Sequence, residues 1–380
     1  MQKRADLHLH TRHSARATDW LMRKVDFPAS CSDPIVLYRG LRAAGFDFVT
    51  FTDHDTIEGC LEIAGQPGAF MSEEVTSFFP EDDVKVHVLA WGISEAQHAE
   101  IQSLRRNVYE FAAWLKREGV AHAVAHPLWP VDERLSLAHW QKLVLLFRHF
   151  ETINGLRDAL PGQTAEFALS RLTPEAVARF AEEQGMEPLW DQPWRKVFTG
   201  GSDDRGGIFA GRAWTWADDV QTPAEFIAAV REGRCGAGGR AGGPLIMAHS
   251  LYSVIFEFAQ ERLMKGAQKP AAALLEKMAG RFMEGKDPTR FTLSEKLGFL
   301  AQGIATGKIW EVALPGNASL WKELADAVGK PGMRNAIEKA TAGVAEPERR
   351  AFITANLLVN QLAFRFFSQF IAQLQAGRLI

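Results

Sequence analysis

The sequence ADLHLHTRHS, from Ala5 to Ser14, begins an apolar strand that carries two imidazoles. Side chains alternate between the faces of a strand, so His8 and His10 point to one side while Leu7 and Leu9 point to the other. Two neighbouring imidazoles at the end of an apolar strand make half of a metal site. Alternatively, both are hydrogen-bonding groups at a strand edge. Metal-type ligands at the ends of later apolar runs favour the metal site.

Those later runs alternate with helix-forming segments. We predict further strands over residues 46–52, 69–76, 84–91, 120–125, 147–153 and 196–199, and helices over 34–44, 94–118, 136–146, 163–170 and 174–184. Strands that alternate with helices predict a parallel α/β arrangement. Polar clusters end four of the runs: Asp53-His54, Glu73-Glu74, His126-Pro127 and Ser202-Asp203-Asp204. In α/β barrels, the carboxyl ends of the strands carry the chemistry.

Length and composition narrow the class of protein. A chain of 380 residues suits one large domain plus a second part. The net charge of −3, without a long basic run, argues against a nucleic-acid surface. The N-terminus lacks an apolar core of signal-peptide length, and polar residues interrupt the apolar stretch 352–374, so we expect a cytoplasmic protein without a membrane span. Three widely spaced cysteines fit neither a disulfide framework nor a cysteine zinc site.

The character of the sequence changes near Leu245. We predict a first domain over residues 1–245 and an all-α domain over 246–380, where apolar residues recur at three- and four-residue spacing. The glycine-rich GAGGRAGG, from Gly236 to Gly243, marks the boundary. It is either a flexible connector or a phosphate-binding nest with Arg240. The region 246–380 also carries a stripe of aromatic residues. We expect this stripe to be buried against the first domain or a second chain, or the region to form a core of its own. The stripe consists of Phe352, Phe364, Phe366, Phe367 and Phe370.

The candidate ligands use imidazole and carboxylate without thiolate, a combination that suits Zn, Mn or Fe. They are His8, His10, Asp53, His54, Glu74, His87, His126 and Asp203. Two ions about 3.5–4 Å apart need a bridging carboxylate and separate imidazoles. Such a pair lowers the pKa of a shared water toward neutrality and holds phosphoryl oxygens for in-line attack.

The motifs DLHLHTRHS, TDHDT, EVT, KVHVLAWG, AHP and GGSDD, in this order, resemble those of the PHP (polymerase and histidinol phosphatase) domain family. The resemblance covers roughly residues 1–245. It implies a distorted (β/α)7 TIM-like barrel with a metal cluster at the carboxyl ends of its strands. By this similarity one ion takes His8, His10, Glu74 and Asp203, and a second takes Glu74 as bridge with His87 and His126. Glu74 is preferred to Glu73 because it directly precedes Val-Thr, and alternation puts Glu73 on the opposite face.

Two departures from the family pattern bear on the chemistry. Ala15 stands where an Asp is common, and Arg205 stands where a His is usual. We therefore expect two divalent ions rather than three. Asp53, His54 and Arg205 are the expected catalytic residues, with His54 as a proton donor or a hydrogen-bonding group. Arg205 either grips a phosphate or pairs with Asp204 or Asp53 in an impaired site.

The leading hypothesis is therefore a metal-dependent phosphoesterase that acts on a small phosphate ester. An alternative enzyme is another metal-dependent hydrolase, of the amidohydrolase type, in which the activated water attacks a carbon centre. A third reading is a catalytically impaired module that keeps metal for stability while its helical region binds a homo-oligomeric or other partner. Specificity is expected to lie in loops such as Trp20 to Asp33 and Trp129 to Arg134, whose sequences name no substrate.

Overall fold

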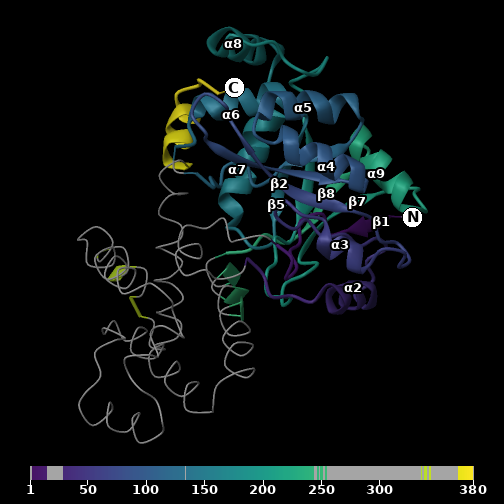
Figure 1. Cartoon of the computed structure of the whole chain (residues 1–380). Coiled ribbons are helices and arrows are strands. Elements are labelled where there is room, and N and C mark those ends of the chain that lie inside the picture. Colours follow the sequence, from purple (N-terminus) through teal and green to yellow (C-terminus); the bar gives the residue numbers. More distant parts are fainter. Residues whose placement is uncertain are drawn as a thin grey trace, which may run out of the picture.

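The protein is described here as a computed structural model, shown in Figure 1. The structure describes residues 2–14, 29–132, 134–243, 246–247, 249–250, 253–254, 335, 338–339, 342–343 and 367–379. Over residues 2–243 it is a mixed α/β fold in which helices surround two sheets. Most elements predicted from the sequence up to residue 201 are present near their expected positions.

The larger sheet has five strands in chain order, but it is not wholly parallel as predicted. Its strands are β2 (Ser72–Phe78), β3 (Lys85–Trp91), β4 (Ala121–Val124), β5 (His149–Asn154) and β6 (Val197–Gly201). β3 is antiparallel to both β2 and β4, whereas β5 is parallel to β4 and β6. A tight turn, closed by the bond from Phe79 N to Val84 O at 2.9 Å, reverses the chain between β2 and β3.

The helices also explain why β3 and β4 run in opposite directions. The helix expected over 94–118 is two helices, because the side chain of Asn107 accepts from the backbone N–H groups of Tyr109 and Glu110 and begins a new helix. Two consecutive helices return the chain to the end of the sheet that it left. The helices are α2 (Pro34–Ala43), α3 (Glu58–Glu62), α4 (Glu95–Leu104), α5 (Val108–Arg117), α6 (Leu137–Leu146), α7 (Ala159–Ser170), α8 (Pro174–Gln184) and α9 (Pro223–Glu232).

The smaller sheet has the order β1-β7-β8 and corrects the prediction for the glycine-rich segment. Its strands are β1 (Lys3–Ala5), β7 (Ala213–Ala217) and β8 (Gly236–Gly239), and both pairings are antiparallel. The first glycines therefore form a strand, neither a connector nor a nest. A Cβ atom at Gly236 or Gly238 would lie 2.6 Å from the ring of Trp216 or Trp214, respectively. Glycine is needed because each ring lies across the backbone of β8.

Two extended segments join the sheets and carry the first motifs. Backbone bonds run from Asp203 N to His8 O at 2.6 Å and from Thr52 N to Leu9 O at 2.7 Å. A parallel bridge then pairs His54 with Glu74. The predicted strand over 46–52 is thus an extended stretch with isolated bridges. The described strands form two linked sheets rather than one continuous closed sheet.

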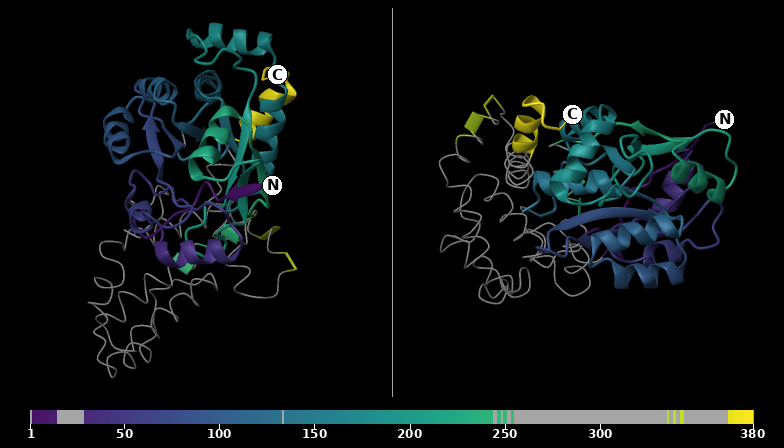
Figure 2. Two further views of the ribbon diagram at one scale, coloured as in Figure 1. Left: turned by 90° about the vertical axis from the view of Figure 1, so that its right-hand side faces the viewer. Right: turned by 90° about the horizontal axis from the view of Figure 1, so that it is seen from above.

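Helical residues 367–375 complete the main core. The side chains of Phe367 and Phe370 are buried in the same cluster as Trp140, and the rings of Phe370 and Trp140 lie 4.9 Å apart. This segment, yellow in Figures 1 and 2, lies beside α6. The other predicted stripe residues Phe352, Phe364 and Phe366 lie outside the described residues. Of the described helices, none has the length and apolar character needed to cross a membrane.

Two uncharged imidazoles are also buried in this fold. His122 Nδ1 donates to Val120 O at 2.7 Å, and His149 Nε2 donates to Val230 O at 2.8 Å. Burial lowers the pKa of His122 to about 4 and, with help from His122 and Arg148, that of His149 to about 3. Both imidazoles are therefore neutral at pH 7.

We expect Phe370→Ala to lower the free energy of unfolding by about 3–5 kcal/mol, because it empties a buried aromatic site. Gln369→Ala is the matched control, since Gln369 is exposed on the same helix. It should change stability by less than about 0.5 kcal/mol. Urea unfolding of the full chain measures both. Equal stability of the two variants would contradict the packing of this segment on the core.

Acid should destabilise the protein partly through His122 and His149. Below pH 6.5 the unfolded chain binds a proton at each imidazole while the folded chain does not, so stability falls with pH by up to about 1.4 kcal/mol per unit per histidine. His122→Asn and His149→Gln retain a donor at the bonded position but do not titrate. The unfolding free energy of the double variant, measured from pH 7 to 4.5, should depend less steeply on pH. Parallel curves would contradict these pKa shifts.

Candidate metal centre

One buried carboxylate, Glu74, lies at the centre of the motifs. Its two oxygens face five imidazoles, and both carboxylate and imidazoles are almost fully buried. Oε1 lies 2.7 Å from His87 Nδ1, 3.3 Å from His126 Nε2 and 3.4 Å from His8 Nε2. Oε2 lies 2.9 Å from His54 Nδ1 and 3.3 Å from His10 Nε2. The neighbouring Glu73 points to the other face, where it binds His98 and Gln102.

Three of the imidazoles are held through Nδ1 and present Nε2 to the centre. His8 Nδ1 bonds to Glu151 Oε1 at 2.9 Å, and His126 Nδ1 bonds to Trp129 O at 3.2 Å. His10 Nδ1 bonds at 2.9 Å to the Ser14 hydroxyl, which itself donates to Asp53. A ligating histidine is normally fixed in this way, because donation from one ring nitrogen leaves the other with a lone pair for the metal.

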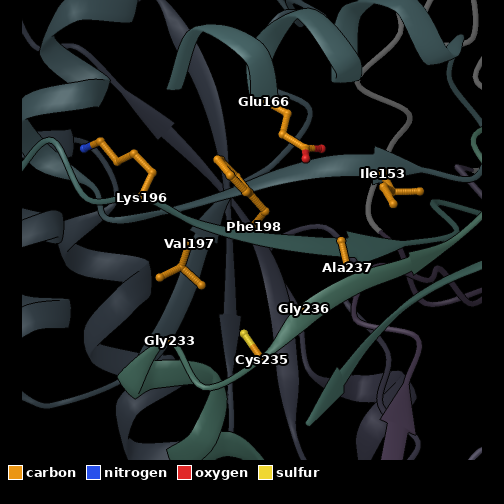
Figure 3. Close-up of a pocket in the computed structure, with 9 residues that line it drawn as sticks. All are labelled: Ile153, Glu166, Lys196, Val197, Phe198, Gly233, Cys235, Gly236 and Ala237. Carbon is orange, nitrogen blue, oxygen red and sulfur yellow. The ribbon is translucent and has the colours of Figure 1, made fainter. Parts of the chain in front are cut away.

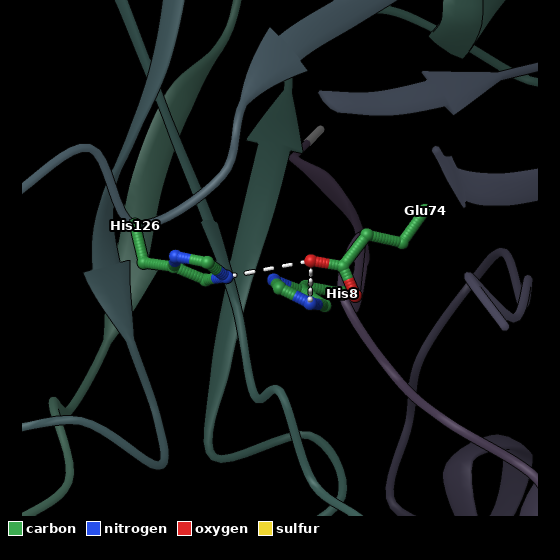
Figure 4. Close-up of side chains that lie close together, drawn as sticks. All are labelled: His8, Glu74 and His126. Atoms are coloured by element: carbon green, nitrogen blue, oxygen red, sulfur yellow. Dashed lines mark ion pairs between the residues drawn. The ribbon is translucent and has the colours of Figure 1, made fainter. Parts of the chain in front are cut away.

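The donors in this centre fit a divalent metal. His8 Nε2, His126 Nε2 and both oxygens of Glu74 are buried without a hydrogen-bond partner, which is costly unless a ligand satisfies them. Figure 4 shows His8 and His126 converging on Glu74. Donor atoms lie close enough to share an ion in three sets: His8, Glu74 and His126; His8, His10 and Asp203; and His10, His54 and Glu74.

His87 and His54 are placed differently from the other imidazoles. His87 lies beside Glu74, but no donor set of the described residues includes it. His54 Nδ1 faces Glu74, and its Nε2 lies 3.3 Å from Arg205. Burial and the nearby Arg205 and His87 lower the pKa of His54 to about 4, although Glu74 opposes this. His54 is thus neutral at pH 7, with the lone pair of its Nε2 toward Arg205.

The predicted catalytic residue Asp53 faces the last residues of the first motif rather than the donors. Its carboxylate accepts from Thr11 N, Thr11 Oγ1 and Ser14 Oγ at 2.6, 2.6 and 2.9 Å. Burial raises the pKa of Asp53, while these bonds oppose the rise. This position lets Asp53 orient His10 through Ser14.

Two arginines flank Asp203, and one of them was not anticipated from the sequence. Arg205 lies 3.2 Å from Oδ1 and Arg157 lies 3.1 Å from Oδ2. The impaired-site alternative expected Arg205 to pair with Asp204 or Asp53. The carboxylate that Arg205 pairs with is instead that of Asp203. Both guanidiniums retain some exposure, 14% for Arg205 and 13% for Arg157. Burial opposes the ionisation of Asp203, but His8 and the arginines hold its pKa well below the ordinary value.

The sequence reasoning also missed two polar groups within β5. Glu151 binds His8 and accepts from the backbone N–H of His126 at 2.9 Å. Asn154 donates to Glu151 and to Asp203 at 3.0 and 3.3 Å. The signal was available in FETINGLRD, because these polar groups lie in and after an apolar strand as the other motifs do.

Two of the site residues have unusual backbones. His126 has φ +31° and Asp203 has φ +51°, values in or near the left-handed region that few non-glycine residues adopt. Such conformations persist where the surrounding contacts determine them, and they gather at functional sites. The bonds from His126 N to Glu151 and from Asp203 N to His8 O supply that constraint.

A cavity of about 270 Å³ lies elsewhere, near the start of β6 and β8, and contains none of these donors. Figure 3 shows its lining, which includes Glu166, Phe198 and Cys235. The Lys196 ammonium donates to Phe147 O at 2.7 Å and also to Val144 O. This cavity is therefore no part of the metal centre.

Comparison with known proteins gives limited matches. No model of a protein family matches the chain. MJ1587, an uncharacterized protein of Methanocaldococcus jannaschii, is 37% identical over 59 residues, which are 16% of this chain and 33% of that protein. The chain thus spans about one third of the length of this relative.

Three solved structures are similar at low identity. PsfC from Pseudomonas syringae is 15% identical, with 68% of this chain and 98% of that chain covered and a TM-score of 0.38. A proposed metal-dependent phosphoesterase from Bifidobacterium adolescentis is 17% identical, with 55% and 90% covered and a TM-score of 0.33. An amidohydrolase from Chromobacterium violaceum, with bound sulfate and no metal, is 16% identical, with 61% and 96% covered and a TM-score of 0.38. All three TM-scores lie below 0.5, so chemical inferences rest on the side chains described above.

Proposed function

We propose that this protein is a metal-dependent hydrolase of small phosphate esters. The support for metal is the set of buried donors around Glu74, in which lone pairs converge without protein partners. The support for a phosphate ester is the pair of guanidiniums on either side of Asp203. We also propose that the linked sheets correspond to the distorted (β/α)7 barrel expected from the sequence. The support is a set of isolated β-bridges between the two ends of the larger sheet. They link the segment after β6 to residue 9, and residues 49 and 54 to residues 69 and 74 at and before β2.

Two divalent ions of Mn, Zn or Fe would be held by His8, His10, Glu74, His126 and Asp203, with Glu74 placed to serve both. His87 is assigned to the second ion, because its Nδ1 lies 2.7 Å from the shared Glu74 oxygen. When bound, such ions lower the pKa of a water molecule and neutralise phosphoryl oxygens. The third donor set differs by including His54, but Arg205 lies 3.3 Å from the Nε2 atom of His54. A permanent positive charge there disfavours a third cation.

The reason for proposing a phosphate ester as the substrate is the pair of arginines, Arg157 and Arg205. Guanidinium groups bind phosphate oxygens through paired N–H donors, and they stabilise the charge that develops during phosphoryl transfer. An amide or lactone offers no comparable anion for Arg157 and Arg205. His54, neutral and accepting from Arg205 at 3.3 Å, is assigned the hydrogen-bonding role rather than that of proton donor. Asp53 is assigned a positioning role through Ser14.

Turnover of p-nitrophenyl phosphate, measured with added Mn²⁺ and again after chelation, tests this function directly. The proposal expects turnover that chelation abolishes and added metal restores. Metal-dependent cleavage of amides or lactones without phosphatase activity would favour the amidohydrolase-like alternative. Stoichiometric metal without turnover of any of these substrates would favour the impaired binding module.

Metal content should depend on Glu74 and not on its neighbour. We expect about two ions per chain in the wild type, and a loss of most of both ions in Glu74→Ala, because the carboxylate serves each. Glu73→Ala is the matched control, since Glu73 faces His98 and Gln102. Elemental analysis of the purified proteins measures the ions. Full metal content in Glu74→Ala would contradict the assignment of Glu74 as the bridge.

Arg205→Ala should leave the metal content unchanged and lower kcat/KM for phosphate esters by about 1.5–3 kcal/mol, the scale of charge-assisted hydrogen bonds. Arg157→Ala should act in the same direction. Arg231→Ala, at an exposed arginine of α9, is the control and should leave kcat/KM unchanged. Unchanged turnover in both Arg157→Ala and Arg205→Ala would rule out the phosphate clamp.

A further inference from the structure

Described residues between 246 and 254 contact the chain neighbours of both arginines. Of the segment 246–254, residues 246, 247, 249, 250, 253 and 254 are described, and all six are helical. The side chains of Met247 and Val254 are buried, with 7% and 1% exposure. They are buried although the segment lies in the region predicted to form a separate domain.

One end of the segment packs beside Arg157. Met247 forms a buried cluster with Trp129 and Leu156. Leu156 is the chain neighbour of Arg157, whose guanidinium carbon lies 5.1 Å from the centre of the Trp129 ring. Trp129 is also tied to the metal centre, because its carbonyl oxygen bonds to His126 Nδ1. Met247 thus supports the surface on which Arg157 lies.

The other end of the segment packs against the chain neighbour of Arg205. A Cβ atom at Gly206 would lie 1.7 Å from Ser253 Oγ, 3.0 Å from Ser253 Cβ and 3.4 Å from Ser250 O. Contacts this short do not occur, so a side chain at residue 206 would force Ser253 or the loop to shift. Ser253 Oγ is fixed in turn by donation to Ser250 O at 3.0 Å.

A second connection reaches the backbone of Arg205 through residues 31 and 32. Ser32 Oγ donates to the backbone carbonyl of Arg205 at 3.3 Å. The adjacent Cys31 contacts the carbonyl of Val254 at 3.6 Å. The Arg205 loop is therefore linked to the segment in two ways. Gly206 contacts Ser253 directly, and Arg205 is connected to Val254 through residues 31 and 32.

We propose that Met247 and Ser253 position the phosphate clamp, with Met247 acting on Arg157 and Ser253 acting on Arg205. The region after residue 245 then contributes to the substrate site through its first helical residues. This inference rests on the proposed function, because it concerns the geometry of the same two arginines. Met247 and Ser253 are positioning residues, since they act through neighbours of the arginines.

The test is a double-mutant cycle on Gly206 and Ser253. Gly206→Ala should displace the Arg205 loop and weaken the binding of inorganic phosphate to the Mn-loaded full chain by about 10- to 100-fold, the scale of a small misplacement. Ser253→Gly removes the atoms that the new methyl group meets. The combination Gly206→Ala with Ser253→Gly should therefore recover binding to the level of Ser253→Gly alone, which should lie below the wild type because its contact with the Arg205 loop is lost.

Gly40→Ala is the matched control, because a Cβ atom at Gly40 meets nothing within 4 Å. Metal content and urea unfolding accompany each titration, so that simple unfolding of Gly206→Ala is recognised. Met247→Ala should also weaken phosphate binding, with metal content retained. Rescue of Gly206→Ala by Ser253→Gly supports the proposal.

Two failures are distinguishable. If the Mn-loaded wild type binds phosphate and Gly206→Ala, folded and metal-loaded, binds it equally well, the positioning role is overturned while the proposed function stands. If the wild type binds no phosphate and cleaves no phosphate ester, the proposed function fails, and the inference fails with it. If binding falls in Gly206→Ala but the double variant shows no rescue, the steric link between Ser253 and Arg205 is overturned.

Discussion

A single buried carboxylate determines how the strands of this protein must be arranged. Glu74 is fully buried, and imidazoles from four separate parts of the chain point at its two oxygens. An isolated buried carboxylate would be strongly destabilising. Here burial opposes ionisation, but His87, His54 and His8 hold the pKa of Glu74 well below its ordinary value. Folding and assembly of the site are therefore the same event.

The sequence predicted the site best where metal-ligand residues recur at the two-residue spacing of a β-strand. Alternation in DLHLH correctly placed His8 and His10 on one face, and the same rule separated Glu74 from Glu73. The direction of each strand relative to its neighbours was harder to predict from the sequence, because an antiparallel strand can have the same composition as a parallel one. The reversal between β2 and β3 depends on a tight turn, and that between β3 and β4 depends on a helix break at Asn107.

Long-range contacts of ordinary residue types could not be predicted. Nothing in the composition of GAGGRAGG indicates that two tryptophans lie across its glycines, since the reason for each glycine is a ring in another strand. Arg157 was overlooked for a similar reason: arginine is not a metal ligand, and its relation to Asp203 depends on the neighbouring ends of β5 and β6. The positions of Asp53 and Arg205 likewise depend on partners distant in sequence.

The burial of Phe370 against Trp140 has a consequence for how the protein is made. These rings are more than two hundred residues apart in the chain, yet they belong to one core. During synthesis, α6 and α8 leave the ribosome long before the segment that covers them. The apolar surface of these helices that packs against residues 367–379 is uncovered until those residues have been synthesised. Contacts between residues so distant in sequence also form slowly. The packing of the main core is therefore complete only after the C-terminal helical residues have been made.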